Sequence, residues 1–319
     1  MARPPPDPLY TLRGLGAAVN TLHFSCSEPA RPLLFSGSSN GAVHIWDLTT
    51  RRSQKVLKGH ADSSILWLDS LSRENLISQG RDMRVCLWSL AEGRADVTDS
   101  LFADSVGFCQ CSLMQGGQGT WLLAHPTDCM EEVKVIELPT KAPLGSLKPE
   151  SKLGMVMCMK LLQTNSGPML VAGYEDGTLV LWDVSQRRPL SSLKAHLEPV
   201  MSLDFDPSRL KGVSGSAEQT ICSWTLDGQQ VLQLQEQVEL VNPGISQLCL
   251  RPDGKILASA GWDHLIRVFG WKKMKPLAVL QYHRDMVLSV TFSDHQDPKQ
   301  RMMAAASKDE RISLWSIYN

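Results

Sequence analysis

Four residue types that could do chemistry together recur along this chain: histidine, serine, aspartate and tryptophan. The fullest set consists of His60, Ser78, Asp82 and Trp88. In nucleophilic hydrolases a histidine takes the proton of a serine, and an aspartate orients the histidine ring. The residue types therefore raise the question of whether this chain is a hydrolase.

The recurrence of the set argues against a hydrolase. Two further copies keep the order of residue types, with one replacement each: His196, Ser214, Glu218 and Trp224, and His283, Ala305, Asp309 and Trp315. One active site needs one set, whereas every half-buried imidazole and indole N–H needs a hydrogen-bond partner. We therefore expect structural hydrogen-bond networks, in which a hydroxyl bridges histidine and tryptophan, and no catalytic residue.

The sequence gives only weak evidence for a metal site. Cys109 and Cys111 have no second Cys/His pair at zinc spacing, and the eight cysteines are scattered, which is typical of buried free thiols. His125, Asp128 and Cys129 share one short polar loop without a fourth ligand. We expect no metal and no cofactor.

The tryptophan position anchors a repeat of about 46 residues. It is occupied in turn by Trp46, Trp88, Ile136, Trp182, Trp224, Phe269 and Trp315. Each copy holds short apolar segments separated by turns that contain glycine, asparagine or aspartate, which indicates antiparallel strands. Seven such copies predict an all-β, seven-bladed β-propeller with four strands in each blade.

The two ends of the chain complement each other. Only four residues follow Trp315, too few for an outer strand, whereas residues 9–13 read as an outer strand with no blade before it. Pairing the two ends would remove an exposed edge. We predict one domain over residues 1–319, closed by the N-terminal strand pairing into the last blade, with a degenerate third blade at about 99–148 because Ile136 replaces the tryptophan.

Composition narrows the classes of partner. The formal net charge is -1, so no basic field would hold nucleic acid or an anionic membrane. No apolar run approaches the length of a membrane span, and the proline-rich start does not resemble a secretory signal. We expect a monomeric protein that resides in the cytoplasm and the nucleus and binds neither nucleic acid nor membrane.

The turns between second and third strands are the expected binding surface. The residue before the turn acid should point towards the upper face of a propeller, and exposed Trp, Tyr and Arg anchor protein interfaces. The expected protein-binding residues are Arg81, Tyr174, Glu175, Trp262 and Lys308. Trp262 is the strongest candidate, because an exposed indole in a turn has little structural justification.

These features together resemble the WD-repeat family over nearly the whole chain. The resemblance is carried by Gly59-His60, Trp46-Asp47 and Trp182-Asp183. Segments such as residues 170–177, 259–264 and 307–315 closely resemble the guanine nucleotide-binding protein beta-subunit-like protein 1 family, which is similar to the fungal ASTRA-associated WD-repeat protein. The resemblance implies a WD40 fold and a non-catalytic scaffold.

The resemblance also implies particular partners. They are the TTT co-chaperone complex and the Hsp90–R2TP machinery, acting in the maturation of PI3K-related kinases and so supporting DNA-damage signalling. No G-protein gamma subunit is expected, because the proline-rich start cannot form the long N-terminal helix of true beta subunits. An alternative is a substrate receptor of a cullin-RING ubiquitin ligase, although Thr49 and Ser185 stand where such receptors often carry arginine.

Overall fold

The computed structural model describes residues 5–25, 32–103, 105, 107–117, 119–295 and 297–318. It consists of two compact units, which we call the first unit (residues 1–102 and 249–319) and the second unit (residues 103–248). Besides strands, the described residues contain three short 3-10 helices: η1 (Ala91–Gly93), η2 (Trp271–Lys273) and η3 (Pro298–Gln300). Within these ranges no helix has the length and apolar character needed to span a membrane.

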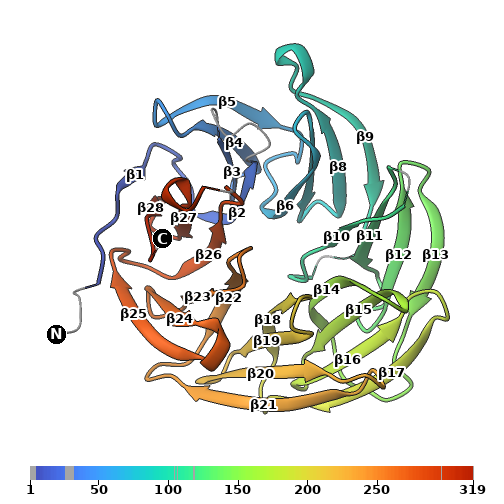
Figure 1. The fold of residues 1–319 in the computed structure, drawn as a ribbon. Helices are drawn as coiled ribbons and strands as arrows, with labels where there is room; N and C mark the ends of the chain where they lie inside the picture. The colour runs from blue at the N-terminus through green and yellow to red at the C-terminus, as the bar shows by residue number, and fades with distance from the viewer. Residues whose placement is uncertain are drawn as a thin grey trace. The chain divides into compact units, whose positions relative to one another are not determined.

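Four four-stranded sheets belong to the first unit, except that residues 245–248 of one strand fall in the second unit (Figure 1). The sheet at its N-terminal end consists of β2 (Val19–Ser25), β3 (Leu33–Ser38), β4 (Ala42–Asp47) and β5 (Arg52–Lys58). The next consists of β6 (Ile65–Ser72), β7 (Asn75–Gly80), β8 (Arg84–Ser89) and β9 (Asp96–Phe102). A third consists of β22 (Ile245–Leu250), β23 (Ile256–Gly261), β24 (Leu265–Gly270) and β25 (Lys275–Gln281). The fourth consists of β26 (Val287–Phe292), β27 (Met303–Ser307), β28 (Ile312–Trp315) and β1 (Tyr10–Leu12).

The second unit contains three sheets of the same kind. The first consists of β10 (Ser112–Gln115), β11 (Trp121–Pro126), β12 (Val133–Leu138) and β13 (Ala142–Leu147). The second consists of β14 (Val156–Thr164), β15 (Gly167–Tyr174), β16 (Thr178–Asp183) and β17 (Arg188–Lys194). The third consists of β18 (Val200–Asp206), β19 (Lys211–Ser216), β20 (Thr220–Leu226) and β21 (Leu232–Glu239). Seven four-stranded sheets confirm the predicted all-β, seven-bladed propeller fold, and we call each sheet a blade.

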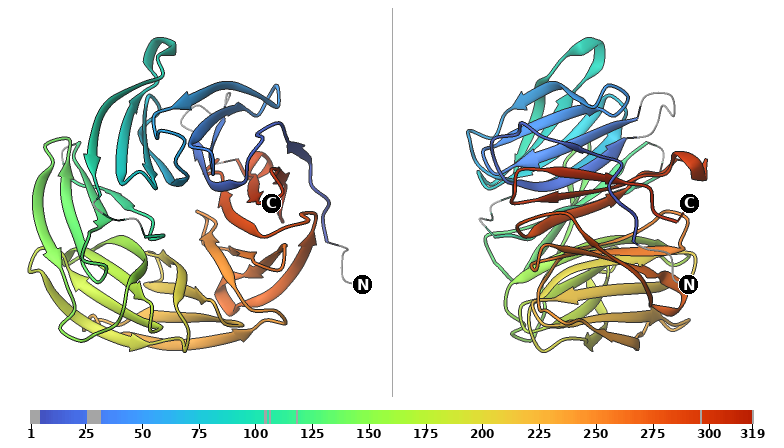
Figure 2. Two further views of the ribbon diagram at one scale, coloured as in Figure 1. Left: turned by 180° about the vertical axis from the view of Figure 1, so that it is seen from behind. Right: turned by 90° about the vertical axis from the view of Figure 1, so that its left-hand side faces the viewer.

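The N-terminal strand β1 is the outer strand of the last blade (Figure 2). It pairs antiparallel with β28, with Tyr10 opposite Leu314 and Leu12 opposite Ile312. The backbone N–H of Leu9 extends the pairing through a bond of 2.7 Å to the carbonyl of Leu314. The residues at the two ends of the chain thus build one sheet, as the lengths of the terminal segments predict.

A bulge marks the anchor position of the repeat. The register between third and fourth strands shifts immediately before Trp46, Trp88, Ile136, Trp182, Trp224 and Phe269. A bulge that recurs at this point in six of the seven blades is a feature of the fold and not a defect. Ile136 and Phe269 therefore occupy the same structural position as the tryptophans, as the repeat spacing predicts.

The boundary of the third blade lies later than expected. Strand β9 continues to Phe102, which is opposite Arg84 of β8, so residues 99–102 belong to the second blade. The third blade's first strand begins at Ser112. The second blade extends past residue 99 because β8 offers backbone partners as far as Arg84, whose guanidinium also lies 5.3 Å from the centroid of the Phe102 ring.

Candidate protein-interaction surface

The turns between second and third strands are held in the same way in five blades. The residue before the turn Asn, Asp or Glu donates its backbone N–H to the carbonyl that precedes the first strand of that blade. The pairs are Ser39 with Ala18, Arg81 with Ser64, Glu175 with Met155, Ala217 with Pro199, and Lys308 with Met286, at 2.8–3.2 Å. These five turn positions are therefore structurally equivalent.

In the first unit these positions carry exposed side chains. Arg81 and Lys308 are exposed, and Trp262 exposes 37% of its surface. Exposed Trp and Arg are the types that anchor protein interfaces. We call these three residues the first-unit edge.

The acids that follow these residues do not cancel the positive charge of the first-unit edge. Each turn acid faces inward onto a partner in its own blade: Asp82 onto His60, Asp263 onto Arg267 and Asp309 onto His283. Arg81 and Lys308 are exposed while the turn acids are engaged within their own blades, so the first-unit edge offers one indole and two cationic side chains on three blades.

The expectation that Tyr174 is an exposed binding residue is wrong. Its side chain is 0% exposed and packs in a cluster with Trp182, Val156 and Leu170. Successive residues of a strand point to opposite faces, so Tyr174, at the end of β15, points inward. Burial raises the pKa of Tyr174. Its role is structural.

Glu175 is exposed, but its carboxylate also has a structural task. Its Oε2 accepts a hydrogen bond of 3.1 Å from the backbone N–H of Met155. The side chain thus fixes the segment that leads into β14. The Glu175 side chain is also exposed, so a partner in solvent can still contact its carboxylate.

In the second blade the structure brings together all four residues of the expected network. Nδ1 of His60 lies 2.8 Å from Oδ1 of Asp82, and Nε2 of His60 lies 2.7 Å from the Ser78 hydroxyl. The Trp88 indole N–H donates to the same hydroxyl at 2.7 Å. The hydroxyl bridges two buried rings, so this serine is not poised to attack a substrate.

In the fifth blade the network stops one residue short. His196 contacts Glu218 at 2.7 Å and the Ser214 hydroxyl at 2.9 Å, but the buried N–H of Trp224 has no hydrogen-bond partner among the described residues. The prediction that Trp224 belongs to this hydrogen-bond network is therefore wrong.

Gly212 explains this difference. It lies opposite Trp224, where the first, second and fourth blades have a leucine. A Cβ on Gly212 would lie 2.1 Å from the indole. The Trp224 ring therefore fills the space over Gly212 and stacks on Phe205, with ring centroids 5.8 Å apart.

In the seventh blade the bridging hydroxyl comes from a residue that the sequence analysis missed. Ser313 of β28 lies 2.8 Å from Nε2 of His283 and accepts the Trp315 indole N–H at 2.8 Å. Burial alone would raise the pKa of Asp309, but the hydrogen bond and charge of His283, together with hydrogen bonds from Arg284 and Ser307, outweigh burial and lower the pKa of this carboxyl. The available signal was a serine two positions before the tryptophan.

The sixth blade replaces the histidine with an arginine. Asp263 receives two hydrogen bonds from the Arg267 guanidinium, at 3.1 and 2.5 Å. Both side chains are largely buried, so the pair takes the place of the His–Asp contact. With Phe269 as anchor there is no indole N–H to satisfy, and within the part of the chain that the structure describes the buried Ser259 hydroxyl has no hydrogen-bond partner.

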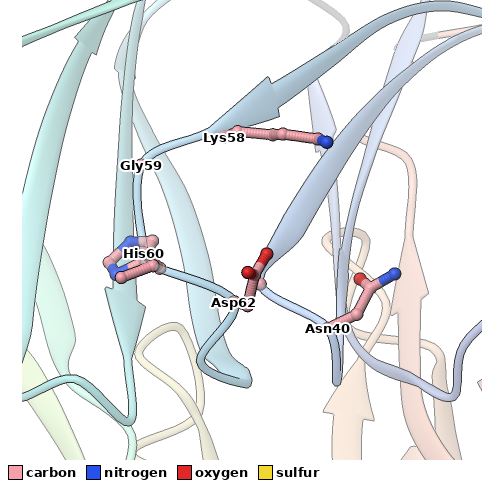
Figure 3. A pocket seen from close by; sticks show the side chains of 7 residues that line it. Asn40, Lys58, Gly59, His60 and Asp62 are labelled. Atoms are coloured by element: carbon pink, nitrogen blue, oxygen red, sulfur yellow. The ribbon is translucent and has the colours of Figure 1, made fainter.

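A hollow of about 260 Å³ lies beside the second-blade network (Figure 3). Its lining includes Asn40, Lys58, His60 and Asp62. The His60 ring is fully buried and bonded to Ser78 and Asp82, so it does not serve the hollow. Gly41 lets the walls approach, since a Cβ there would lie 2.9 Å from Asp62. The remaining side chains offer mixed charge, from Lys58 and Asp62, and no serine or cysteine nucleophile.

A second Ser/His/Asp grouping connects two neighbouring blades of the first unit. Nε2 of His23 on β2 lies 2.8 Å from the Ser70 hydroxyl, and its Nδ1 lies 3.6 Å from Oδ1 of Asp69 on β6. The second distance is too long for a hydrogen bond, so Asp69 does not fix the ring as a catalytic aspartate does. The sequence analysis missed this grouping because its members come from different repeats.

The weak metal candidates do not assemble. His125 is buried with its Nδ1 2.9 Å from the Pro126 carbonyl, whereas Asp128 is exposed. Burial raises the pKa of the Cys109 and Cys111 thiols, which disfavours the thiolate that a metal requires. No cluster of three or more His, Cys, Asp or Glu suited to a metal occurs in the part of the chain that the structure describes.

Comparison with known proteins places these features in a family. The family "WD domain, G-beta repeat" matches residues 6–47, 142–183, 187–225, 236–270 and 274–316. The matched segments omit the second blade, although that blade carries the complete hydrogen-bond network.

Individual relatives are similar to this chain over nearly its whole length. The chain is 52% identical to the mouse (Mus musculus) guanine nucleotide-binding protein subunit beta-like protein 1, covering 99% of this chain and 97% of the relative. It is 28% identical to the ASTRA-associated protein 1 of Verticillium alfalfae, covering 98% and 93% of the two chains. For the Schizosaccharomyces pombe protein of that name, identity is 27% and coverage 98% and 99%.

Proposed function

Because the chain belongs to the WD40-repeat family of guanine nucleotide-binding protein subunit beta-like protein 1, we propose that it is a non-catalytic adaptor that links protein partners of an ASTRA-type assembly. The relatives named for ASTRA match nearly end to end, so the likeness is not confined to one blade.

The observation that carries the proposal is the first-unit edge. Trp262, Arg81 and Lys308 occupy turn positions of three blades, with the neighbouring acids engaged inside the blades. Such a surface offers anchors for a protein partner and no arrangement for bond cleavage. The grouped Ser, His and Asp residues serve the fold instead.

The partners we propose are the TTT co-chaperone components and PI3K-related kinases. In this role the protein assists kinase maturation together with the Hsp90–R2TP machinery and so supports DNA-damage signalling. It would act in the cytoplasm and the nucleus. A cullin-RING receptor role gains no support from the described residues.

Affinity purification with quantitative mass spectrometry tests this function. Wild-type protein should recover co-chaperone components and kinases, and Trp262→Ala and Arg81→Glu should each reduce that recovery several-fold, as expected for interface anchors. Leu277→Ala is the matched control, because Leu277 is 41% exposed on the outer strand of the same blade as Trp262.

The possible outcomes distinguish an error in the proposed function from an error in the proposed binding surface. Absence of kinases and co-chaperones from the wild-type sample contradicts the proposed function. Full recovery by both edge variants shows instead that the partners bind elsewhere on the molecule.

A further inference from the structure

The second unit carries its own row of loops, distinct from Arg81, Trp262 and Lys308. We define the second-unit edge as residues 127–132, 148–155, 175–178, 194–199, 216–219 and 239–244. Backbone bonds tie these segments together in sequence. The carbonyl of Met130 accepts from Val156, the carbonyls of Met155 and Leu153 accept from Glu175 and Asp176, and the carbonyl of Gly177 accepts from His196.

One turn lies between the two most exposed apolar residues of this edge. The turn at residues 216–219 bonds on one side to the loop of Leu197, through Ala217 N–H to the Pro199 carbonyl at 3.2 Å. On its other side it bonds to the loop of Val241, whose carbonyl accepts from Nε2 of Gln219 at 3.1 Å. The loops that carry Leu197 and Val241 therefore flank a single turn.

Leu197 and Val241 project into solvent from fixed backbone. They are 83% and 85% exposed, more than any other large apolar side chain of the described chain. Pro199 and Pro243 restrict the two loops, and Gly244 donates to the Glu218 carbonyl at 3.1 Å. Because the backbone is already ordered, a partner that covers these side chains loses little entropy at this surface.

The second-unit edge also carries an excess of acidic residues. The second-unit edge contains nine acidic residues and three lysines, so its field is negative. Glu175 and Glu198 are both exposed. One of the lysines, Lys194, is engaged with Asp176 through an ion pair of 3.5 Å.

We propose that the second-unit edge is a docking surface for a lysine- or arginine-rich amphipathic segment of a partner protein. Apolar residues of the segment cover Leu197, Val241 and the similarly exposed Met130, which is 57% exposed. Its cations face Glu175 and Glu198. An acidic segment is disfavoured by like charge, and a purely apolar one leaves the carboxylates without compensation. The surface gives the adaptor a second contact, opposite in charge to the first-unit edge.

Fluorescence anisotropy with full-length protein tests the proposal. The probe is a labelled amphipathic peptide of lysine and leucine. Two matched peptides accompany it, one with every leucine replaced by serine and one with every lysine replaced by glutamate. Wild-type protein should bind only the first, and binding should weaken as salt is raised.

Edge variants locate the binding. Leu197→Ser combined with Val241→Ser should weaken binding about tenfold, because the peptide can no longer bury these two apolar side chains. Glu175→Gln combined with Glu198→Gln should weaken it several-fold at low salt and leave it unchanged at high salt. The control is Leu210→Ser combined with Leu234→Ser, because both leucines are 39% exposed in the same unit and lie outside the edge.

Several results would overturn the proposal. They are failure of wild-type protein to bind the lysine–leucine peptide, equal binding of the serine peptide, and equal losses in edge and control variants. Light scattering adds another: self-association lost in the Leu197/Val241 variant assigns the edge to a second copy of this chain. Purification with Trp262→Ala probes the other unit, so either proposal can fail while the other stands.

Discussion

Ser313 lies directly across the strand pair from Ala305, and the Ser313 hydroxyl joins His283 to Trp315. In the second blade the serine is on the other strand of this pair, where Ser78 faces Cys86. The hydroxyl has changed strands while the hydrogen bonds that it makes are the same. What the network requires is a hydroxyl on either member of one register pair.

Replacing Ser313 with alanine should destabilise the protein. The change leaves Nε2 of His283 and the N–H of Trp315 buried without their shared partner. Each buried unsatisfied group costs about 1–3 kcal/mol. We expect the free energy of unfolding, measured by urea denaturation, to fall by about 2–3 kcal/mol.

The double variant Ala305→Ser with Ser313→Ala is the control for this prediction. It returns the hydroxyl to the strand used in the second blade and should recover part of the lost stability. An unfolding free energy of Ser313→Ala equal to that of the wild type would contradict the proposed role of the hydroxyl.

Asp82 should matter for stability in the same way. Asp82→Ala removes the partner of His60 Nδ1 and the acceptor that receives the Arg84 backbone N–H at 3.3 Å. We expect a loss of about 1–2 kcal/mol, read from thermal denaturation. Asp96→Ala, at an exposed position of β9 in the same blade, should leave the melting temperature nearly unchanged. Equal effects of the two variants would show that the turn acid has no special role.

The architecture could be predicted because it depends on spacing along the chain. The anchor recurs about every 46 residues even where Ile136 and Phe269 replace tryptophan, and a bulge precedes both of these residues as it precedes four of the tryptophans. The pairing of β1 with β28 followed from the lengths of the terminal segments.

The site was harder to predict because it depends on side-chain direction and on neighbours across strands. Tyr174 occupies the expected place in the chain, but strand alternation turns it inward. Trp224 has a serine at the expected spacing, yet Gly212 opposite it changes where the ring lies. The role of Arg267 depends on its pairing with Asp263 four residues before it, where the second and seventh blades pair the turn acid with a histidine. Strand register and packing decide where these three side chains lie, and the spacing of residues along the chain does not specify either of them.

Gly212→Ala tests the packing explanation for Trp224. The added methyl group would lie 2.1 Å from the indole, so the ring must move. Overpacking of this kind costs about 1–3 kcal/mol, and tryptophan fluorescence should change with it. Gly228→Ala is the matched control, since a Cβ there meets nothing within 4 Å. If both variants unfold at the same urea concentration, the ring does not depend on Gly212.

Arg267 should be essential to the sixth blade. Arg267→Met keeps much of the side-chain volume but leaves the largely buried Asp263 carboxylate without its cation. Breaking a buried pair from one side costs about 3–5 kcal/mol. Adding Asp263→Asn should restore part of the loss, because the charge that was stranded is removed. A double variant as unstable as the sum of the two single variants would show that the residues act independently.

Buried histidines should make stability depend on pH. Burial lowers the pKa of His44 below its usual value of 6.5, and burial likewise lowers that of His295. Below about pH 6.5 the unfolded chain therefore binds protons that the folded protein excludes. The histidine contribution to stability is complete above that pH and is lost as pH falls through the folded-state pKa values. Urea denaturation between neutral and mildly acidic pH should show a falling free energy of unfolding, and His44→Gln should show a smaller fall. His264→Asn, at an exposed turn position, should keep the wild-type slope, and a flat wild-type profile would contradict the assignment.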